Sequence, residues 1–273
     1  MPVAFEQKER YRMDDLLAIM AILRGENGCP WDREQDHDTI RKNFLEETYE
    51  VLDAIDNRDL DGLKEELGDV LLQVVFHSRM EEEAGNFRFD DVCDGICKKL
   101  IHRHPHIFGD VVATDSGQVL RNWDAIKKEE KGQATAADTL YSVPKALPAL
   151  MRAEKVQGRA AKAGFDYPDL DWAMGDFLSE VDELREAIKE GDKPHQQEEL
   201  GDLLFSAVNL ARFLKLDPEE SLAKSCEKFM ARFAMTEQLA KEEGKTFADY
   251  SIQELNELWA QGKERLAGTP ANS

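Results

Sequence analysis

The chain has 273 residues, a formal net charge of −21 and a pI near 4.7. Such an excess of acids repels a duplex phosphate backbone and argues against polymeric nucleic acid as a partner. A small phosphorylated ligand is compatible with this negative charge if a divalent cation lies between the ligand and the acids. The longest apolar run, at residues 70–76, is too short to cross a bilayer, and the first residues lack the apolar core of a secretory signal. Four cysteines suggest no disulfide framework. We therefore expect a soluble, cytoplasmic protein with no membrane partner.

Apolar residues recur at the spacing of one helix face, as at Leu67, Val70, Leu71, Val74 and Val75. Good helix formers dominate these stretches, and no alternating run bounded by turns indicates a strand. The fold class is therefore predicted to be all-α. In chain order, the predicted helices span residues 11–24, 37–56, 60–83, 89–102, 118–130, 146–162, 172–190, 195–214, 217–240 and 251–265.

The chain repeats itself at an offset of 133 residues. The pentapeptide EELGD stands at residues 65–69 and again at residues 198–202, and FLEETYEVLDAI from residue 44 matches FLSEVDELREAI from residue 177 at the same offset. One register held over both motifs indicates two related halves. We predict helical-bundle domains at residues 1–132 and 145–273, with a linker at residues 133–144 and a disordered tail formed by the last six residues, GTPANS.

Acidic residues in each half are spaced to converge. Residues three apart on a helix share a face, so Glu47 and Glu50 present two carboxylates together, as do Glu66 and Asp69. A turn-like stretch at residues 57–62 lets the second helix fold back on the first, so that the four carboxylates face one another. A hard divalent cation stabilises such a cluster, and Mg²⁺ is the usual ion when phosphates complete its shell. The second half repeats the set as Glu180, Glu183, Glu199 and Asp202.

Cationic and aromatic residues repeat alongside the acids. Each half carries a lysine and arginine four residues apart and a tryptophan and lysine four residues apart, so each pair lies on one helical face. The side chains are Lys99, Arg103, Trp123 and Lys127 in the first half and Lys228, Arg232, Trp259 and Lys263 in the second. Lysine and arginine suit phosphate oxygens, and tryptophan can stack on a base. Taken singly these are ordinary solvated or core residues, but their repetition indicates a nucleotide polyphosphate site.

The motifs as a set resemble the MazG family of nucleoside triphosphate pyrophosphohydrolases, within the all-α NTP pyrophosphatase superfamily. The resemblance covers nearly the whole chain. It is carried by GCPWDREQDHDTI from residue 28, EELGDVLLQVVFH from residue 65, HRHPHIFGDV from residue 102, KVQGRAAKAGFDY from residue 155 and EELGDLLFSAVNLAR from residue 198.

The resemblance implies Mg²⁺-dependent hydrolysis of NTPs and dNTPs to the nucleoside monophosphate and pyrophosphate by a homodimer, with Mn²⁺ as a substitute ion and a role in clearing the nucleotide pool. It implies that the eight acids hold the metal and that one of them helps to activate water, with Glu180, Glu183, Glu47 and Glu50 as the catalytic candidates. Lys228, Arg232 and Trp259 would contact the substrate. The second half looks like the usual catalytic domain, although Ser179 stands where the first half has Glu46.

Three alternatives stay open on the sequence. A narrower dUTP or dCTP pyrophosphatase would share the acids, but the resemblance runs through both halves. A non-enzymatic helical scaffold that binds divalent ions would not explain the repeated lysine, arginine and tryptophan set. A di-iron bundle normally needs two Glu-x-x-His motifs, and only residues 34–37 qualify.

Overall fold

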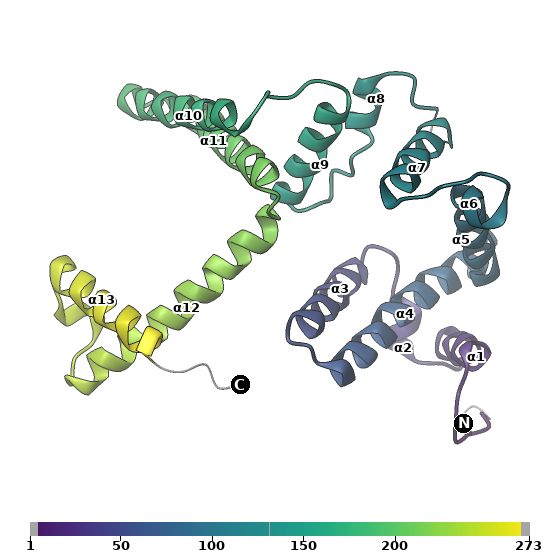
Figure 1. Cartoon of the computed structure of the whole chain (residues 1–273). Coiled ribbons are helices and arrows are strands. Elements are labelled where there is room, and N and C mark those ends of the chain that lie inside the picture. The colour runs from purple at the N-terminus through teal and green to yellow at the C-terminus, as the bar shows by residue number, and fades with distance from the viewer. Residues whose placement is uncertain (1–4, 131, 269–273) are drawn as a thin grey trace. The chain divides into compact units, whose positions relative to one another are not determined.

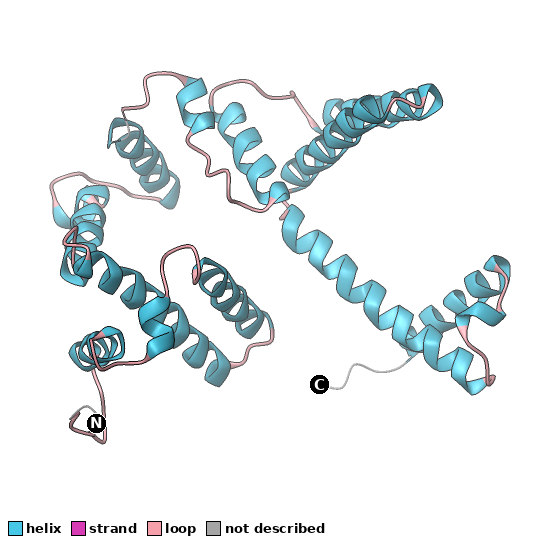
Figure 2. Ribbon diagram, turned by 180° about the vertical axis from the view of Figure 1, so that it is seen from behind, coloured by secondary structure: helices cyan, strands magenta, loops and turns pink. Residues whose placement is uncertain are grey.

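The computed structural model describes residues 5–130 and 132–268, so the predicted tail beyond Gly268 lies outside the described residues. Helices are the only regular secondary structure in the described part (Figure 2), which confirms the all-α prediction. By its contacts the chain divides into two compact units, Met1–Lys127 and Lys128–Ser273. The domain boundaries at residues 132 and 145 stay a prediction. No helix of the described residues is both long and apolar enough to span a membrane.

The first unit contains two long helices and several shorter ones (Figure 1). In chain order they are α1 (Met13–Arg24), α2 (Pro30–Glu34), α3 (Arg41–Asp56), α4 (Leu60–Glu83), α5 (Phe89–Arg103), α6 (Pro105–Phe108) and α7 (Ser116–Glu130), the last of which continues to the first residues of the second unit. Its core gathers buried Met20, Ile40, Val75, Phe76 and Met80 from α1, α4 and the residue before α3.

The second unit is built around three long helices. In chain order its elements are α8 (Ala136–Tyr141), α9 (Ala149–Lys162), α10 (Leu170–Glu190), α11 (Lys193–Leu214), α12 (Pro218–Glu242), the 3₁₀ turn η1 (Phe247–Asp249) and α13 (Ile252–Gly268). Buried Ala173 and Ala187 on α10 and Val208 on α11 are small, and small side chains let the two helices pack closely.

Each of the ten predicted helices is present, with ends that differ by a few residues. The largest difference is at α3, which begins at Arg41 rather than at residue 37. Asp36 accounts for it, because its carboxylate accepts the backbone N–H groups of Asp38 at 3.0 Å and Thr39 at 2.9 Å and so stabilises a turn. The short elements α2, α6, α8 and η1 were not predicted, since three to six residues are too few to display a helical period.

Two helix pairs carry the repeat, α3 with α4 and α10 with α11, and each pair is joined by a tight turn (Figure 1). Arg58 in the first turn has φ 55° and Gly191 in the second has φ 76°, both in the left-handed region. These residues are separated by the same 133 positions as the acidic motifs (191 minus 58). The backbone reversal is therefore repeated at the same point, and it sets the register in which the acids of one helix meet those of the next.

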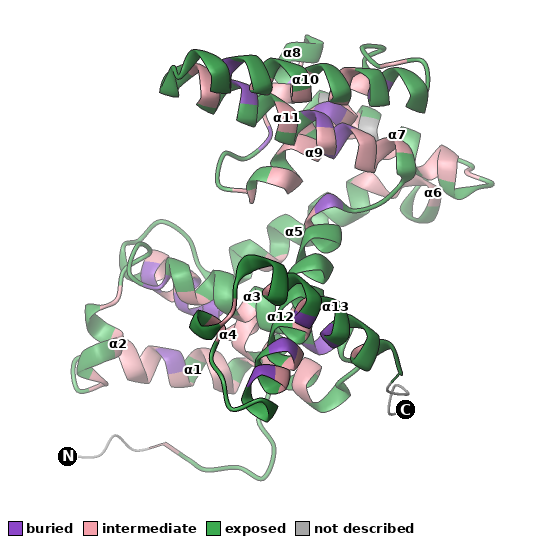
Figure 3. Cartoon of the chain, turned by 90° about the vertical axis from the view of Figure 1, so that its left-hand side faces the viewer, coloured by how far each residue is buried: buried purple, intermediate pink, exposed green. Residues whose placement is uncertain are grey.

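Both pairs expose apolar residues at equivalent positions. Leu45 and Leu178 are each 55% exposed, and Leu67 and Leu200 are 52% and 49% exposed. Figure 3 shows exposed residues along much of α10, with buried residues confined to short stretches. An apolar face that recurs in both halves is typical of a surface covered by another protein element.

Candidate active site

The first acidic centre lies between α3 and α4. Glu47 of α3 and Glu66 and Asp69 of α4 each offer one carboxylate oxygen, and these oxygens lie within 4.8 Å of one another. All three residues are partly buried. Glu50, one turn further along α3, stands beside this group, because its carboxylate is within hydrogen-bonding reach of both Glu47 and Glu66. The structure thus brings three of the four predicted acids into one group and leaves the fourth at its edge.

The second centre repeats this arrangement between α10 and α11. Glu180, Glu199 and Asp202 bring one carboxylate oxygen each within 4.8 Å of one another. Glu183 lies at the edge, as Glu50 does, and its Oε1 accepts a hydrogen bond from the Ser179 hydroxyl at 2.9 Å. Ser179 occupies the position equivalent to Glu46, so at this point the second half has a hydroxyl donor in place of an acid.

Like charges at close range disfavour ionisation of the acids in both centres. Burial raises the pKa of Glu47, and the charges of Asp69 and Glu50 raise it further. Burial also raises the pKa of Glu180, assisted by Glu183 and Asp202. At Glu66 the pKa is raised by burial and then by Glu50. The carboxylates are held where they repel one another, which is unfavourable unless a positive charge is present.

Glu199 provides a direct test of whether the second centre fits a cation. The residue is 8% exposed, and its Oε1 lies 3.1 Å from Nε2 of His195. Its Oε2 is buried without a hydrogen-bond partner among the described residues. A buried carboxylate oxygen with no partner is costly, and a hard cation among several carboxylates removes that cost. The donor set, all oxygen, is the kind that binds divalent metal ions in proteins.

The predicted substrate-binding side chains lie on other helices than the acids. In the second unit, Lys228 and Arg232 project from α12, while Trp259 and Lys263 belong to α13, which packs on α12. The ring of Trp259 lies 5.3 Å from that of Phe229. Within the described part of the chain, no hydrogen bond or ion pair occupies the side chains of Lys228, Arg232 or Lys263.

In the first unit, Lys99 and Arg103 lie on α5, and Trp123 and Lys127 lie on α7. Lys127 places its Nζ 4.0 Å from the centre of the Trp123 ring, a cation–π contact. That face of the indole is therefore already covered by the lysine of the same helix. Trp123 also contacts His104, with ring centres 6.0 Å apart.

Sequence reasoning missed several polar groups around the second centre. His195 lies four residues before Glu199 on α11, a spacing that could have been noticed, and the adjacent carboxylates of Glu190 and Glu199 raise its pKa. The equivalent position in the first half is Gly62. Ser179 precedes Glu183 by the same four residues on α10, so the spacing allowed this contact as well, although the hydrogen bond itself depends on the rotamers of both side chains.

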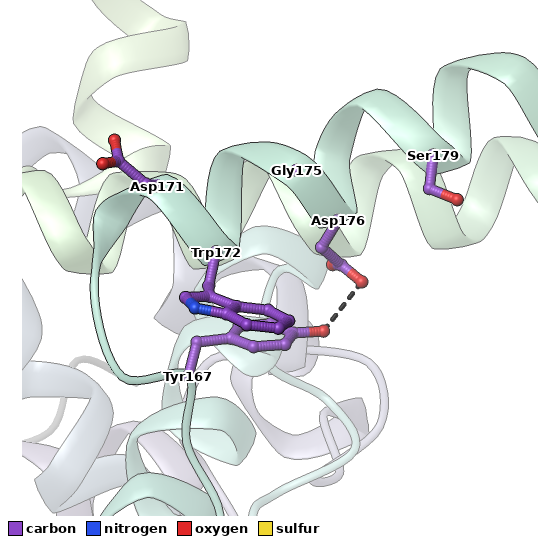
Figure 4. A pocket seen from close by; sticks show the side chains of 6 residues that line it. All are labelled: Tyr167, Asp171, Trp172, Gly175, Asp176 and Ser179. Atoms are coloured by element: carbon purple, nitrogen blue, oxygen red, sulfur yellow. Dashed lines mark hydrogen bonds between the residues drawn. The ribbon is translucent and has the colours of Figure 1, made fainter.

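A recess of about 500 Å³ opens beside the second centre, lined by Tyr167, Asp171, Trp172, Gly175, Asp176 and Ser179 (Figure 4). The hydroxyl of Tyr167 donates to Asp176 Oδ1 at 2.7 Å. This hydrogen bond raises the pKa of Tyr167 to about 12. Asp176 stands one helical turn before Glu180, so an aromatic wall lies next to the acids.

Two helix pairs, each with three converging carboxylates, define an all-helical protein with a duplicated acidic centre. A model of the MazG nucleotide pyrophosphohydrolase domain matches residues 35–108 and 173–234, and each matched segment contains one centre. The chain is 45% identical over 257 residues to the nucleoside triphosphate pyrophosphohydrolase of Escherichia coli (strain K12), which covers 93% of this chain and 98% of that relative.

Two further relatives extend the comparison. The nucleoside triphosphate pyrophosphohydrolase/pyrophosphatase MazG of Thermotoga maritima is 41% identical over 250 residues, which is 92% of this chain and 95% of the relative. The uncharacterized protein YabN of Bacillus subtilis is 44% identical over 264 residues, which is 96% of this chain and 54% of the relative. The chain belongs to the MazG family.

The raised pKa values predict how the metal-free protein responds to pH. Because folded Glu180 holds its proton more tightly than an unfolded glutamate, the free energy of unfolding falls as the pH rises from the ordinary value of 4.5 through the raised pKa. Glu180→Gln removes this titration. In the presence of a chelator, thermal unfolding should show the variant more stable than the wild type at neutral pH, with the difference vanishing near the ordinary glutamate pKa. A difference that is constant with pH, or that grows as the pH falls, would contradict this assignment.

Proposed function

We propose that this chain, a nucleoside triphosphate pyrophosphohydrolase of the MazG family, hydrolyses NTPs and dNTPs to the nucleoside monophosphate and pyrophosphate with Mg²⁺, or with Mn²⁺ in its place, bound at its acidic centres. Its role would be to remove nucleotides from the pool. The observation that carries the proposal is the second centre, where three carboxylates converge and a buried Glu199 oxygen has no partner among the described residues. We rank this centre first for catalysis and the first-half centre second.

The metal would be held by Glu180, Glu183, Glu199 and Asp202 in the second half and by Glu47, Glu50, Glu66 and Asp69 in the first. A divalent cation bound there neutralises phosphate charge and lowers the pKa of a coordinated water. Glu199 is kept in place by His195, and Glu183 by Ser179. These two contacts fix acids that would otherwise move apart by repulsion.

Glu183 is suited to receive the proton of the attacking water. Its Oε1 is used by Ser179, while its Oε2 has no donor among the described residues. The side chain is exposed, so a water molecule can reach it. In the proposed reaction, the water oxygen bonds to phosphorus, its proton passes to Oε2 of Glu183, and the bond between the α- and β-phosphates breaks to release pyrophosphate. Glu180 in this half and Glu47 and Glu50 in the other are the remaining candidates for that role.

The cations of the later helices would bind the triphosphate. In a chain of net charge −21, many basic side chains form ion pairs, as Lys224 does with Glu220 and Lys241 with Glu237. Lys228 and Arg232, on the same helix, form none among the described residues and are therefore available to an anionic ligand. Trp259 and Lys263 complete the proposed set, and the first-half equivalents are Lys99, Arg103, Trp123 and Lys127.

A second copy of the chain is the proposed partner. An exposed apolar face recurs on α3–α4 and on α10–α11, where it includes Leu45, Leu67, Leu178 and Leu200. Such a repeated apolar face suits a contact between two copies of the chain. We expect a homodimer, and a molecular mass in solution equal to that of the 31.0 kDa chain would contradict it.

Product analysis tests the proposed reaction. Purified protein is incubated with Mg²⁺ and a panel of NTPs and dNTPs, and nucleoside monophosphate, diphosphate, phosphate and pyrophosphate are resolved separately. We expect monophosphate and pyrophosphate in equal amounts, with activity lost on adding a chelator and restored by Mg²⁺ or Mn²⁺. Nucleoside diphosphate with phosphate would indicate a different phosphohydrolase, and no turnover would favour an ion-binding scaffold.

Matched variants in the two halves test the ranking of the centres in the same assay. Glu183→Ala should abolish most of the activity, because it removes the proposed proton acceptor of the principal site, a change of the order of 10²-fold or more. Glu50→Ala at the equivalent position should reduce activity less. The reverse order would show that the first half is the principal site.

A further inference from the structure

A second pocket, distinct from the recess of Figure 4, lies between α9, α11 and the loop that joins α9 to α10. Its volume is about 450 Å³, and the residues that matter for its chemistry are Gln157, Ala160, Phe165, Tyr167, Phe205 and Asn209. Four of these belong to KVQGRAAKAGFDY, a motif from residue 155 to which the carboxylate chemistry assigns no role.

Gln157 places an unsatisfied acceptor at the pocket. The residue is 8% exposed, and its Nε2 donates to the backbone oxygen of Phe205 at 2.7 Å, which fixes the orientation of the amide. The other end of the amide, Oε1, is buried without a partner among the residues that the structure describes. Buried acceptors are usually satisfied, so an orphaned one in the lining of a pocket points to a ligand that donates a hydrogen bond.

Asn209 supplies the complementary group. Its Oδ1 accepts from Arg212, from Nε at 3.1 Å and from Nη2 at 2.8 Å, so its Nδ2 is the end of the amide left over. Nδ2 has no acceptor in the described part of the chain. Arg212 is itself held by both carboxylate oxygens of Asp166, one of them at 2.9 Å from Nη1. The pocket therefore presents one acceptor, oriented by the backbone oxygen of Phe205, and one donor, oriented by the Arg212 side chain.

The walls select a flat, uncharged ligand. Phe165, Tyr167 and Phe205 contribute aromatic rings, and a volume of about 450 Å³ lies within the usual range for small-molecule pockets. Arg212 already pairs with Asp166, so the pocket offers a phosphate no unpaired guanidinium. A planar heterocycle with a donor beside an acceptor on one edge meets all of these conditions, and a nucleobase is such a heterocycle.

Tyr167 connects this pocket to the carboxylates. It lines both this pocket and the recess of Figure 4, and its hydroxyl is fixed by Asp176 on α10. The recess in turn includes Ser179, which donates to Glu183. A continuous run of lining residues thus leads from Gln157 to the second acidic centre.

We propose that the Gln157–Asn209 pocket binds the base of the nucleoside triphosphate and determines which bases the second centre accepts. This inference rests on the proposed function. It assigns base recognition to hydrogen bonds with the two amides, and it leaves the phosphates to the carboxylate centre and the cations.

The test is to fill the pocket without touching a hydrogen bond. Ala160→Leu in the full chain adds bulk at the lining, and Ala163→Leu is the matched control, since Ala163 is exposed on the same helix end and does not line the pocket. KM and kcat are measured for ATP, GTP, CTP and UTP, together with competitive inhibition by inorganic tripolyphosphate, which has no base. We expect Ala160→Leu to raise KM at least tenfold for the preferred nucleotide, with kcat and inhibition by tripolyphosphate within twofold of the wild type and the control unchanged.

A second variant removes the amide and keeps the volume. Gln157→Met should bring the KM values of the four nucleotides closer together, because the hydrogen bond that discriminates among bases is lost, while tripolyphosphate still inhibits. Intact tripolyphosphate inhibition also reports that each variant is folded. Unchanged KM values in both variants would overturn the proposal and favour the recess lined by Trp172. An equal loss of nucleotide and tripolyphosphate binding would overturn it as well, since the substitution would then have disturbed the folded structure rather than the binding of the base.

Direct binding separates this proposal from the proposed function. Adenosine, guanosine, cytidine and uridine are titrated by saturation-transfer NMR, which needs no turnover. Binding of at least one nucleoside to the wild type and its loss in Ala160→Leu would support the pocket even if no triphosphate were hydrolysed. Hydrolysis without any nucleoside binding or base preference would leave the proposed function intact and refute the base pocket.

Discussion

The close approach of carboxylates across a pair of packed helices is the constraint on which this structure depends. Each α-helical pair brings one carboxylate oxygen from each of three acids within 4.8 Å, and burial, followed by the charges of the neighbouring acids, raises the pKa values of Glu47 and Glu180. Nothing in helix packing favours such an arrangement, because separate acids on the solvated faces would avoid the repulsion. The arrangement becomes favourable when a divalent cation is bound. The packing of the helix pair therefore keeps the carboxylates close together despite their mutual repulsion.

The two halves share this frame and differ in how they support it. The second half has a hydroxyl at Ser179 where the first has Glu46, and it has His195 where the first has Gly62. Ser179 replaces an acid with a hydroxyl that donates to Glu183, and His195 replaces a glycine with an imidazole beside Glu199. In the first half, Glu50 instead lies beside the carboxylates of Glu47 and Glu66 and raises the pKa of both. Sequence duplication has thus preserved the acids, while the side chains around them have diverged toward a better ordered site in the second half.

The sequence predicted those features that depend on periodicity. The ten longer helices follow from apolar spacing, and the approach of Glu47 to Glu66 and Asp69 follows from acids that share a face on each of two helices joined by a turn. The sequence could not distinguish the three converging acids from the fourth, because that depends on the rotamers of Glu50 and Glu183. It also gave no sign that Gln157 and Asn209 line one pocket, since these residues lie on different helices and are brought together by packing rather than by spacing. Periodicity indicates the helix face on which a residue lies. The chemistry of a site depends on the distances between side-chain atoms, which are set by rotamers and packing.

Binding of divalent cations at both acidic centres can be measured by titration with Mn²⁺ followed by electron paramagnetic resonance. Glu199→Gln and Glu66→Gln keep the side-chain shape and remove one charge from the second and first centres. We expect two groups of sites in the wild type, the loss of one group in each single variant, and no saturable binding in the double variant. If the double variant bound Mn²⁺ as the wild type does, the converging carboxylates would not be the metal sites.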